Sequence, residues 1–310
     1  MLKGKDLLSI HELSVSEVEE ILDFAAQLKA FQKAGIPHRL LEGKTLGMIF
    51  EKSSTRTRVS FEVGMYQLGG SALFLSNRDL QLGRGEPIKD TARVLSRYLD
   101  GIMIRTFGHE RVIELAKYAD IPIINGLTDL LHPCQVLTDL LTIQEHKGKN
   151  FKSLKMTYVG DGNNMTNSYL YGAAKVGMTL SVATPSDYRP NQEVFQNALE
   201  DAKETGAVLS WTDDPVEAVK DADIVVTDTW ASMGQESEHD ARKQIFAPYQ
   251  VNSELLKHAD KRAVVMHCLP AYRGEEVTEE VFEANAHVIF DEAENRLHTQ
   301  KAIMALTMAD

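Results

Sequence analysis

The sequence lacks the features that define several protein classes. Only two cysteines, Cys134 and Cys268, occur in 310 residues, so a disulfide framework is excluded and a reducing compartment is expected. No apolar run approaches the ~20 residues that span a bilayer, and the first residues lack the apolar core of a signal peptide. These absences argue against secreted disulfide-rich proteins and membrane proteins, and we expect a cytoplasmic protein.

Basic residues are also in the minority. Lysine and arginine total 33 against 45 aspartates and glutamates, which gives a formal net charge of −12. A protein that binds long nucleic acids needs a basic surface, so this class is excluded, whereas a small anion can still be held by a few arginines. The remaining composition, 43% hydrophobic and 25% charged, is typical of a folded chain that buries its own core.

Short apolar runs alternate with amphipathic helical patterns along the chain. Helices are predicted after Ser14, after His132-Pro133 through about Lys147, at the end of the chain and between most of the predicted strands. Apolar strands that alternate with helices indicate an α/β fold, with parallel sheets covered on both faces. The strands are predicted at 45–50, 71–76, 101–106, 121–125, 155–161, 178–184, 207–212, 222–228, 262–268 and 287–291.

A polar, glycine-containing segment at 146–150 lies near the midpoint of the chain. It separates two α/β halves of similar size, so we predict a domain boundary there. In parallel sheets of this kind, ligands bind beyond the C-terminal ends of the strands. The residues that follow each predicted strand are therefore the candidates for chemistry.

The first predicted strand is followed by a cluster of hydroxyl and guanidinium side chains. The segment Ser54-Thr55-Arg56-Thr57-Arg58 comes after the strand that ends at Phe50 and directly before a helical pattern. A helix N-terminus carries partial positive charge and donor N–H groups, and arginine forks suit phosphate. We predict an anion site here. The alternative is a hydroxyl-rich helix cap beside two solvated arginines.

Two further strand ends in the first half carry polar residues. Arg105 ends the strand at 101–106, and His132-Pro133-Cys134-Gln135 opens a helix. A lone histidine is more often structural than catalytic. The pair His132 and Cys134 also suggests a metal, but no second pair at zinc-finger spacing accompanies it, so no metal is predicted.

The second half carries a different set of strand-end residues. The segment Gly160-Asp161-Gly162-Asn163-Asn164-Met165 resembles a dinucleotide-binding turn, but Met165 replaces the third glycine and disfavours a nicotinamide enzyme. Asp228 ends another strand and either pairs with a ligand ammonium or caps a turn. The segment His267-Cys268-Leu269-Pro270 ends a third, where a buried cysteine before a proline turn is the simplest interpretation.

Taken together, these segments resemble the aspartate/ornithine transcarbamoylase family, whose members transfer the carbamoyl group of carbamoyl phosphate to an amine. The resemblance extends from about Leu7 to the last helix. The pair 54–58 and 132–135 is the family signature. The segments Asp228-x-x-x-Ser232-Met233-Gly234, His267-Cys268-Leu269-Pro270 and 291–296 are similar to the members that use ornithine rather than aspartate.

The resemblance implies two doubly wound parallel-sheet domains with the active site in the cleft between them. Residues 1–148, joined by the C-terminal helix of about 293–310, would bind carbamoyl phosphate, and 149–292 would bind ornithine. It also implies a homotrimer or a multiple of trimers, no cofactor, no metal and a cis bond at Leu269-Pro270.

The family's functional residues can be transferred to the matching positions. The catalytic set would be Arg56, Arg105, His132, Cys268 and Arg296. Carbamoyl phosphate would be bound by Ser54, Thr55, Arg56, Thr57, Arg105, His132, Gln135, Cys268, Leu269 and Arg296, with Gln81 lent by a neighbouring subunit. Ornithine would be bound by Asn164, Asp228, Ser232 and Met233.

The expected reaction is direct attack of ornithine's δ-amine on the carbamoyl carbon, giving citrulline and phosphate without a covalent enzyme intermediate. Because the amine must be neutral to attack, we expect turnover to rise between about pH 6 and about pH 8.5. Three alternatives stay open. They are a sister enzyme that uses putrescine or an acylated ornithine, a nicotinamide oxidoreductase, and a non-enzymatic binding protein on the same fold. Biosynthesis and the reverse, catabolic direction would use the same residues.

Overall fold

In a computed structural model of the protein, the structure describes residues 2–76, 85–231 and 238–309. The chain forms two compact units. The first comprises Met1–Leu141 and Asn295–Asp310, and the second comprises Thr142–Glu294. The chain passes between the units within two helices, α5 (Pro133–Lys147) and α12 (Ala286–Met308). The domain limits inferred from the sequence, 1–148 with about 293–310 and 149–292, stay a prediction.

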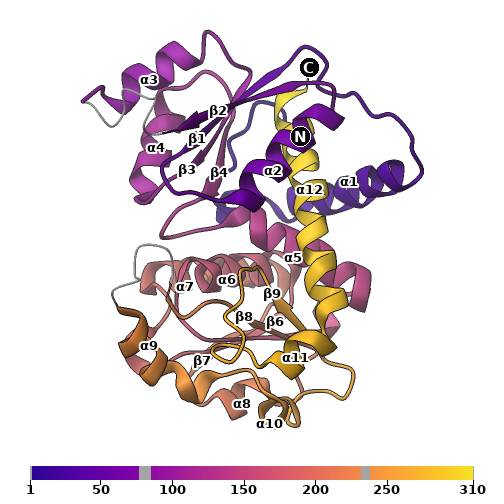
Figure 1. The fold of residues 1–310 in the computed structure, drawn as a ribbon, viewed down its shortest axis with the longest axis vertical. Coiled ribbons are helices and arrows are strands. Elements are labelled where there is room, and N and C mark those ends of the chain that lie inside the picture. Colours follow the sequence, from indigo (N-terminus) through magenta and orange to yellow (C-terminus); the bar gives the residue numbers. More distant parts are fainter. Residues whose placement is uncertain (1, 77–84, 232–237, 310) are drawn as a thin grey trace. The chain divides into compact units, whose positions relative to one another are not determined.

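The first unit is built on a parallel sheet with the strand order β2-β1-β3-β4 (Figure 1). Both β1 and β3 are almost entirely buried, as expected for strands that are covered by helices on both faces. The edge strand β2 is largely exposed. The strands are β1 (Thr45–Phe50), β2 (Ser71–Ser76), β3 (Gly101–Arg105) and β4 (Ile123–Leu127).

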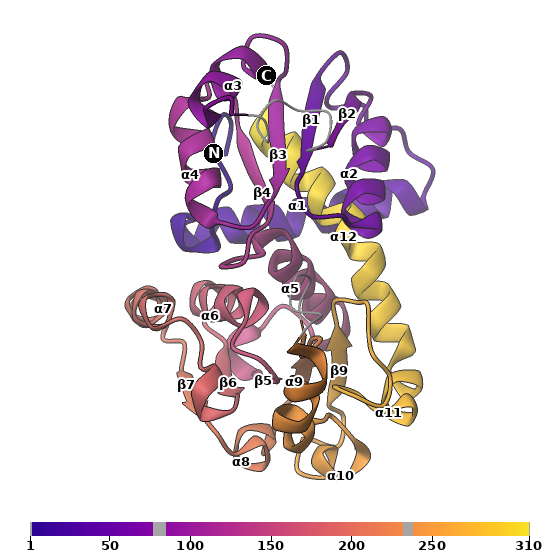
Figure 2. The ribbon, with the colours of Figure 1, turned by 60° about the vertical axis from the view of Figure 1, so that its left-hand side comes forward.

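Helices cover both faces of this sheet. The two views agree that α3 and α4 lie on one face, whereas α2 and the C-terminal part of α12 lie on the other (Figures 1 and 2). The first helix begins with a capping box, in which Ser14 and Glu17 satisfy each other's backbone N–H groups. The helices are α1 (Val15–Lys33), α2 (Thr55–Gln67), α3 (Ile88–Leu95) and α4 (His109–Tyr118).

The second unit has a parallel sheet with the order β7-β6-β5-β8-β9. Residues of α8, α10 and α11 share one buried apolar cluster with β5, β8 and β9, while α6 and α7 cover the opposite face (Figure 2). The strands are β5 (Lys155–Val159), β6 (Thr179–Ala183), β7 (Leu209–Thr212), β8 (Ile224–Thr227) and β9 (Val264–His267). The helices are α6 (Asn164–Val176), α7 (Gln192–Thr205), α8 (Pro215–Val219), α9 (His239–Phe246), α10 (Ser253–Leu256) and α11 (Glu279–Ala284).

These two parallel sheets confirm the predicted α/β fold class. The strand predicted at 287–291 is wrong, because this segment is the start of α12. Buried residues recur there with helical spacing, at Val288, Glu292, Arg296 and Thr299. A short apolar run does not distinguish a strand from the buried face of a helix, and only the continuation of the pattern decides.

Each sheet contains a point where the strand order reverses. In the first unit the chain runs from β1 to β2 on one side and then returns to β3 on the other side of β1. In the second unit it runs through β5, β6 and β7 and then returns to β8, beside β5. Ligands of doubly wound proteins bind outside the C-terminal strand ends at such switch points. The predicted site residues follow these strands.

Within the described ranges, no helix combines the length and the apolar character needed to cross a membrane.

Candidate active site

The first cluster of predicted site residues lies at the switch point between β1 and β3. Phe50, the last residue of β1, is aligned with Arg105, the last residue of β3. Ser54 caps α2 by accepting a hydrogen bond from the Thr57 backbone N–H at 3.2 Å. The helix begins at Thr55, inside the segment that the sequence pattern placed before the helix. The first turn of α2 therefore contains Thr55, Arg56 and Thr57, beside the positive end of the helix dipole.

We call the first-unit members of the predicted set the anion cluster: Ser54, Thr55, Arg56, Thr57, Arg105, His132, Gln135 and Arg296. Thr55 and Arg56 are exposed, so an incoming anion can reach them. By contrast, Thr57, Arg105 and Arg296 are buried. A cluster with both exposed and buried guanidinium groups can capture an anion and then hold it away from water.

Arg296 joins three helices within the cluster. It lies on α12, donates from Nη1 to Oε1 of Gln135 on α5, and donates from Nη2 to Oγ1 of Thr57 on α2 at 3.0 Å. Gln135 in turn donates from Nε2 to Oδ1 of Asp139 at 2.7 Å. The C-terminal helix thus brings a residue that is 239 positions from Thr57 in sequence into direct contact with it. Asp139 was not among the residues predicted from the sequence.

Burial and nearby positive charge determine the protonation state of His132. Burial lowers the pKa of this imidazole well below its usual value, and the charges of Arg296 and Arg105 lower it further. His132 is therefore neutral near pH 7. A neutral imidazole keeps one N–H donor, which can polarise a carbonyl oxygen without adding another charge to a cationic site.

Cys134 is a structural residue. Burial raises the pKa of its thiol to about 12, and its Sγ donates to the Asn125 carbonyl oxygen at 3.4 Å. Because metals are bound by the thiolate, a thiol that stays protonated is a poor ligand. The environment of Cys134 thus argues against the metal interpretation of His132 and Cys134.

The second cluster surrounds Asp228, which follows β8, and its members come from the ends of the neighbouring strands β5 and β9. Asp228 is 9% exposed. Its Oδ2 accepts from Nδ2 of Asn163 at 2.9 Å, and its Oδ1 accepts from the Thr229 backbone N–H at 2.8 Å and from Sγ of Cys268 at 3.3 Å. Three donors thus fix the position of the Asp228 carboxylate. Cys268 is one of them, and it donates as a thiol.

Asn164 stays a predicted ornithine-binding residue, and the structure adds its neighbour Asn163, which contacts Asp228. Asn163 is the N-cap of α6, where its Oδ1 accepts from the backbone N–H groups of Met165 and Thr166 and its amide nitrogen remains to reach Asp228. Asn164 is the first residue of α6. An asparagine at the cap position after a strand was the signal that could have identified Asn163.

The glycine of the dinucleotide-like turn has a packing role. A Cβ atom at Gly162 would lie 2.3 Å from the Tyr188 carbonyl oxygen, so only glycine fits. Close backbone packing inside the second unit therefore accounts for this part of the Gly-x-Gly pattern. It leaves the nicotinamide alternative with little support.

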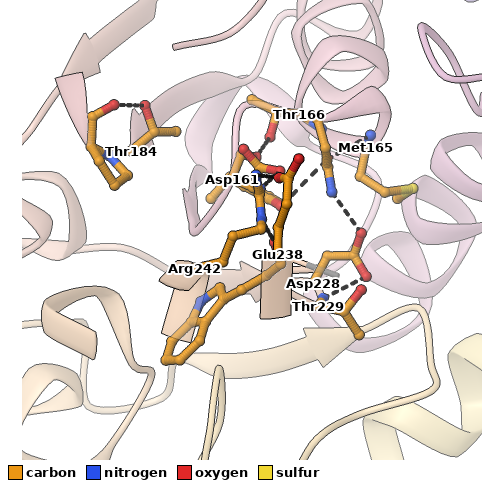
Figure 3. A network of polar contacts seen from close by, with 12 residues as sticks. Asp161, Met165, Thr166, Thr184, Asp228, Thr229, Glu238 and Arg242 are labelled. Carbon is orange, nitrogen blue, oxygen red and sulfur yellow. Dashed lines mark hydrogen bonds and ion pairs between the residues drawn. The ribbon is translucent and has the colours of Figure 1, made fainter. Parts of the chain in front are cut away.

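A buried ion pair lies beside Asp228 (Figure 3). Arg242 on α9 donates from Nη2 to Asp161 and from Nε to the Trp230 carbonyl oxygen, and Glu238 lies 3.7 Å away on the exposed side. Burial raises the pKa of Asp161 to about 6, an effect that the charge of Arg242 opposes and that of Asp228 reinforces. Arg242 is the cationic partner of Asp161, whereas Asp228 accepts from the neutral amide, backbone and thiol groups of Asn163, Thr229 and Cys268. A buried carboxylate held by neutral donors suits a cationic ligand.

A hydrogen-bonded turn holds Cys268 next to Asp228. His267 ends β9, and its Nδ1 accepts from the Leu269 backbone N–H at 2.9 Å. The ring proton therefore sits on Nε2 and is donated to Oε1 of Glu276 at 3.0 Å, with both side chains fully buried. Leu269 has a φ of 59°, which is unusual for a non-glycine residue, and Leu269-Pro270 is cis, as predicted. Glu292 accepts from the His267 backbone N–H at 3.0 Å.

Asp228, His267 and Cys268 place their ligand atoms within 4.8 Å of one another, which raises the question of a metal. Both ring nitrogens of His267 are already used, Nδ1 as an acceptor from Leu269 and Nε2 as a donor to Glu276. This histidine has no lone pair left for a metal within the described part of the chain. We therefore assign no metal to this trio.

Three predicted site residues, Gln81, Ser232 and Met233, lie outside the described residues. Every other predicted residue belongs to one of the two clusters or, for Asn164 and Leu269, adjoins the second.

Comparison with known proteins decides the family. A model described as "Aspartate/ornithine carbamoyltransferase, carbamoyl-P binding domain" matches residues 5–145, and one described as "Aspartate/ornithine carbamoyltransferase, Asp/Orn binding domain" matches residues 152–307. The chain belongs to the aspartate/ornithine carbamoyltransferase family. The resemblance predicted from the sequence motifs is confirmed. A carbamoyl-phosphate-binding domain therefore contains most of the anion cluster, and an Asp/Orn-binding domain contains the Asp228 cluster.

Members of this family are similar over nearly the whole chain. A relative from Carboxydothermus hydrogenoformans named ornithine carbamoyltransferase is 59% identical over 306 residues, which is 99% of this chain and 98% of the relative. The solved structure of ornithine carbamoyltransferase from Pyrococcus furiosus has a TM-score of 0.96 at 55% identity and covers 99% of this chain and 98% of that one. The anabolic ornithine carbamoyltransferase of Campylobacter jejuni has a TM-score of 0.91 at 45% identity, with 97% of each chain covered.

Proposed function

We propose that the protein transfers the carbamoyl group of carbamoyl phosphate to the δ-amine of L-ornithine and releases L-citrulline and phosphate. The observation that carries this proposal is the charge of the Asp228 cluster. A second-substrate site for aspartate would have to balance an additional carboxylate, whereas the buried Asp228 carboxylate here accepts its hydrogen bonds from neutral donors. That charge suits the ammonium of a diamino acid. The relatives named ornithine carbamoyltransferase support the same choice.

The anion cluster would bind carbamoyl phosphate. Arg56, exposed in the first turn of α2, and the hydroxyls of Ser54 and Thr55 are suited to the phosphate. The buried donors of Thr57, Arg105, His132 and Arg296 are suited to the carbamoyl oxygen. Each well-placed donor to a developing negative charge is typically worth ~10²–10³ in rate.

The Asp228 cluster would bind ornithine. We assign the α-ammonium to Asp228 and propose that Asn164, Ser232 and Met233 complete this side. Cys268 donates its thiol proton to Asp228, so the sulfur is not poised as a nucleophile. The neutral δ-amine would attack the carbamoyl carbon directly. The C–N bond forms, the C–O bond to phosphate breaks with its electron pair leaving on phosphate, and the amine gives up one proton.

This chemistry requires neither a cofactor nor a metal. Carbamoyl phosphate is already activated, and holding both reactants in one orientation supplies ~7–11 kcal/mol in well-oriented cases. The amine has a reference pKa of ~10.4, so turnover should rise between about pH 6 and about pH 8.5 as more of it becomes neutral. A flat or falling pH profile would contradict the requirement for a free amine.

We also propose a homotrimer in which Gln81 completes the carbamoyl-phosphate site of a neighbouring subunit. Support comes from the apolar surface of the first unit. On the edge strand β2, Leu73 is 48% and Phe74 is 40% exposed, and on α2 Val59 is 52% and Tyr66 is 80% exposed. An exposed apolar edge strand of this kind is normally covered in the functional assembly.

Mixing two inactive variants tests the shared site. Arg56→Ala and Gln81→Ala trimers should each have low activity. After the chains are exchanged, some sites would combine an intact Arg56 from one chain with an intact Gln81 from another, and activity should return. No recovery in samples whose mixed composition is verified by mass spectrometry would contradict the shared site.

A panel of acceptors tests the function itself. Purified protein with carbamoyl phosphate should carbamoylate ornithine at least a hundredfold more efficiently than putrescine, N-acetylornithine or aspartate, as kcat/KM. Preference for another amine would replace the substrate assignment. Failure to form any carbamoylated product would favour a non-enzymatic binding protein.

A further inference from the structure

Asp139 is a buried carboxylate that the reaction described above does not use. It lies on α5, one helical turn after Gln135, and its side chain is 0% exposed. Its Oδ1 accepts the hydrogen bond from Nε2 of Gln135 at 2.7 Å. Burying a carboxylate at such a depth costs free energy unless hydrogen bonds or a charged partner compensate for the lost water.

The contact with Asp139 fixes the orientation of Gln135. Because Oδ1 of Asp139 accepts this hydrogen bond, the amide nitrogen of Gln135 faces Asp139. The amide oxygen then faces the opposite way, where it accepts from Nη1 of Arg296. A flipped amide would present its N–H₂ group to a guanidinium that has only donors, and that contact would be repulsive.

The same chain of hydrogen bonds continues to the first turn of α2. Arg296 donates from Nη2 to Oγ1 of Thr57 at 3.0 Å, and Ser54 donates from Oγ to the same oxygen at 3.1 Å. A hydroxyl oxygen has two acceptor positions and one O–H. Because both acceptor positions of Thr57 are used, its proton remains available to donate to a ligand.

We propose that Asp139 is a positioning residue for the carbamoyl-phosphate half of the site. Through Gln135 it orients the Arg296 guanidinium and makes the Thr57 hydroxyl a donor. This inference rests on the proposed function, because its readout is the use of carbamoyl phosphate. Asp139 touches neither substrate in this account, so its effect reaches the reacting atoms only through Gln135 and Arg296.

Two variants of Asp139 separate orientation from charge. Asp139→Asn keeps an oxygen that can accept from Gln135, whereas Asp139→Leu has a similar size and no acceptor. We expect Asp139→Leu to lower kcat/KM for carbamoyl phosphate by about 10- to 100-fold, in the range of effects seen when supporting hydrogen bonds of a site are lost. Asp139→Asn should stay within about threefold of wild type, and the KM for ornithine should change little in either variant.

A double-mutant cycle with Arg296 tests the route of the effect. If Asp139 acts through Arg296, adding Asp139→Leu to Arg296→Met should lower kcat/KM by less than about threefold more. Leu140→Ala, which removes a fully buried side chain from the same helix, is the matched control. It should lower the thermal unfolding midpoint and leave the KM for carbamoyl phosphate unchanged.

Three results would overturn the inference. They are an Asp139→Leu enzyme with wild-type kinetics, an Asp139→Asn enzyme as impaired as Asp139→Leu, and effects of Asp139 and Arg296 that multiply independently. If Asp139→Leu does not fold, Asp139→Asn can still be compared with wild type. A folded Asp139→Asn enzyme whose kcat/KM for carbamoyl phosphate is more than tenfold lower would contradict the idea that accepting the hydrogen bond from Gln135 is what matters. If the wild-type protein does not transfer the carbamoyl group to ornithine, the proposed function is refuted instead. A failure of the inference about Asp139 can therefore be told apart from a failure of the proposed function.

Discussion

Replacement of Arg242 by methionine should destabilise the second unit in a strongly pH-dependent way. Arg242 is 4% exposed and is the cationic partner of the buried Asp161. Removing one partner of a buried ion pair typically costs about 3–5 kcal/mol, because the other charge stays buried and uncompensated. Methionine keeps much of the packing volume between the aromatic rings of Tyr188 and Phe246, so the loss should be mainly electrostatic.

The pKa of Asp161 sets the pH window. In the wild type this pKa is raised to about 6. Between pH 3.8 and pH 6 the folded state therefore keeps a proton that the unfolded chain, in which Asp161 has a pKa of 3.8, has lost. This contribution stabilises below the unfolded value and is lost as the pH rises through about 6. Without Arg242 the folded pKa rises further, and Asp161 keeps its proton above pH 6 at a cost of about 1.4 kcal/mol per pH unit. The destabilisation by Arg242→Met should therefore grow between pH 6 and pH 8, by at most roughly 2.7 kcal/mol.

Urea unfolding followed by tryptophan fluorescence is a suitable assay. Both tryptophans of the chain, Trp211 and Trp230, lie in the second unit, so their emission reports on that unit. The matched control is Lys243→Met, the next residue on α9, whose side chain is 53% exposed and pairs with Glu275. That variant should change stability by less than about 1 kcal/mol at every pH. The double variant Asp161→Asn with Arg242→Met should lose the pH dependence. An Arg242→Met penalty that is constant from pH 6 to pH 8 would refute the reasoning.

Three further predictions concern single residues. Arg56→Ala should raise the KM for carbamoyl phosphate about 10- to 100-fold and lower kcat, because a charge-assisted pair to phosphate is lost; wild-type values in steady-state kinetics would contradict the anion site. Asp228→Asn should raise the KM for ornithine by a similar factor and leave carbamoyl-phosphate affinity, measured by calorimetry, almost unchanged; equal losses for both ligands would count against pairing with an ammonium. Lys301 is fully buried, donates to Gln67 at 2.9 Å and to His38 at 3.1 Å, and burial lowers its pKa from 10.5 to about 8. Because the unfolded chain binds the extra proton above pH 8, the wild type should gain about 2 kcal/mol over Lys301→Met between pH 8 and pH 9.5. Calorimetric unfolding checks this, and a constant difference would contradict it.

The strand ends could be predicted from the sequence because apolar runs are local signals. Arg105 and Asp228 follow such runs directly, and both lie where the strand order of their sheet reverses. The hydroxyl and arginine cluster at α2 was equally visible, since its residues are consecutive. Its helical state was not, because the helix begins at Thr55, before the apolar periodicity becomes apparent.

Contacts between distant residues were beyond sequence reasoning. Arg242 and Asp161 are 81 residues apart, and each alone is an ordinary charged residue. Asp139 follows Gln135 by one helical turn, which the sequence shows. The role of that pair depends on the contact of Gln135 with Arg296, 161 residues away, which the sequence does not show. The contact of Asn163 with Asp228 depends on the geometry of the helix cap, which the sequence does not show.

The central claim is direct transfer of the carbamoyl group to ornithine, and initial-rate kinetics with both substrates varied tests it most directly. Citrulline formation should give intersecting double-reciprocal lines, because both reactants must be bound together before the C–N bond forms. Parallel lines, with a carbamoyl group trapped on the protein and located by mass spectrometry at Cys268, would contradict direct transfer and assign the thiol as a nucleophile.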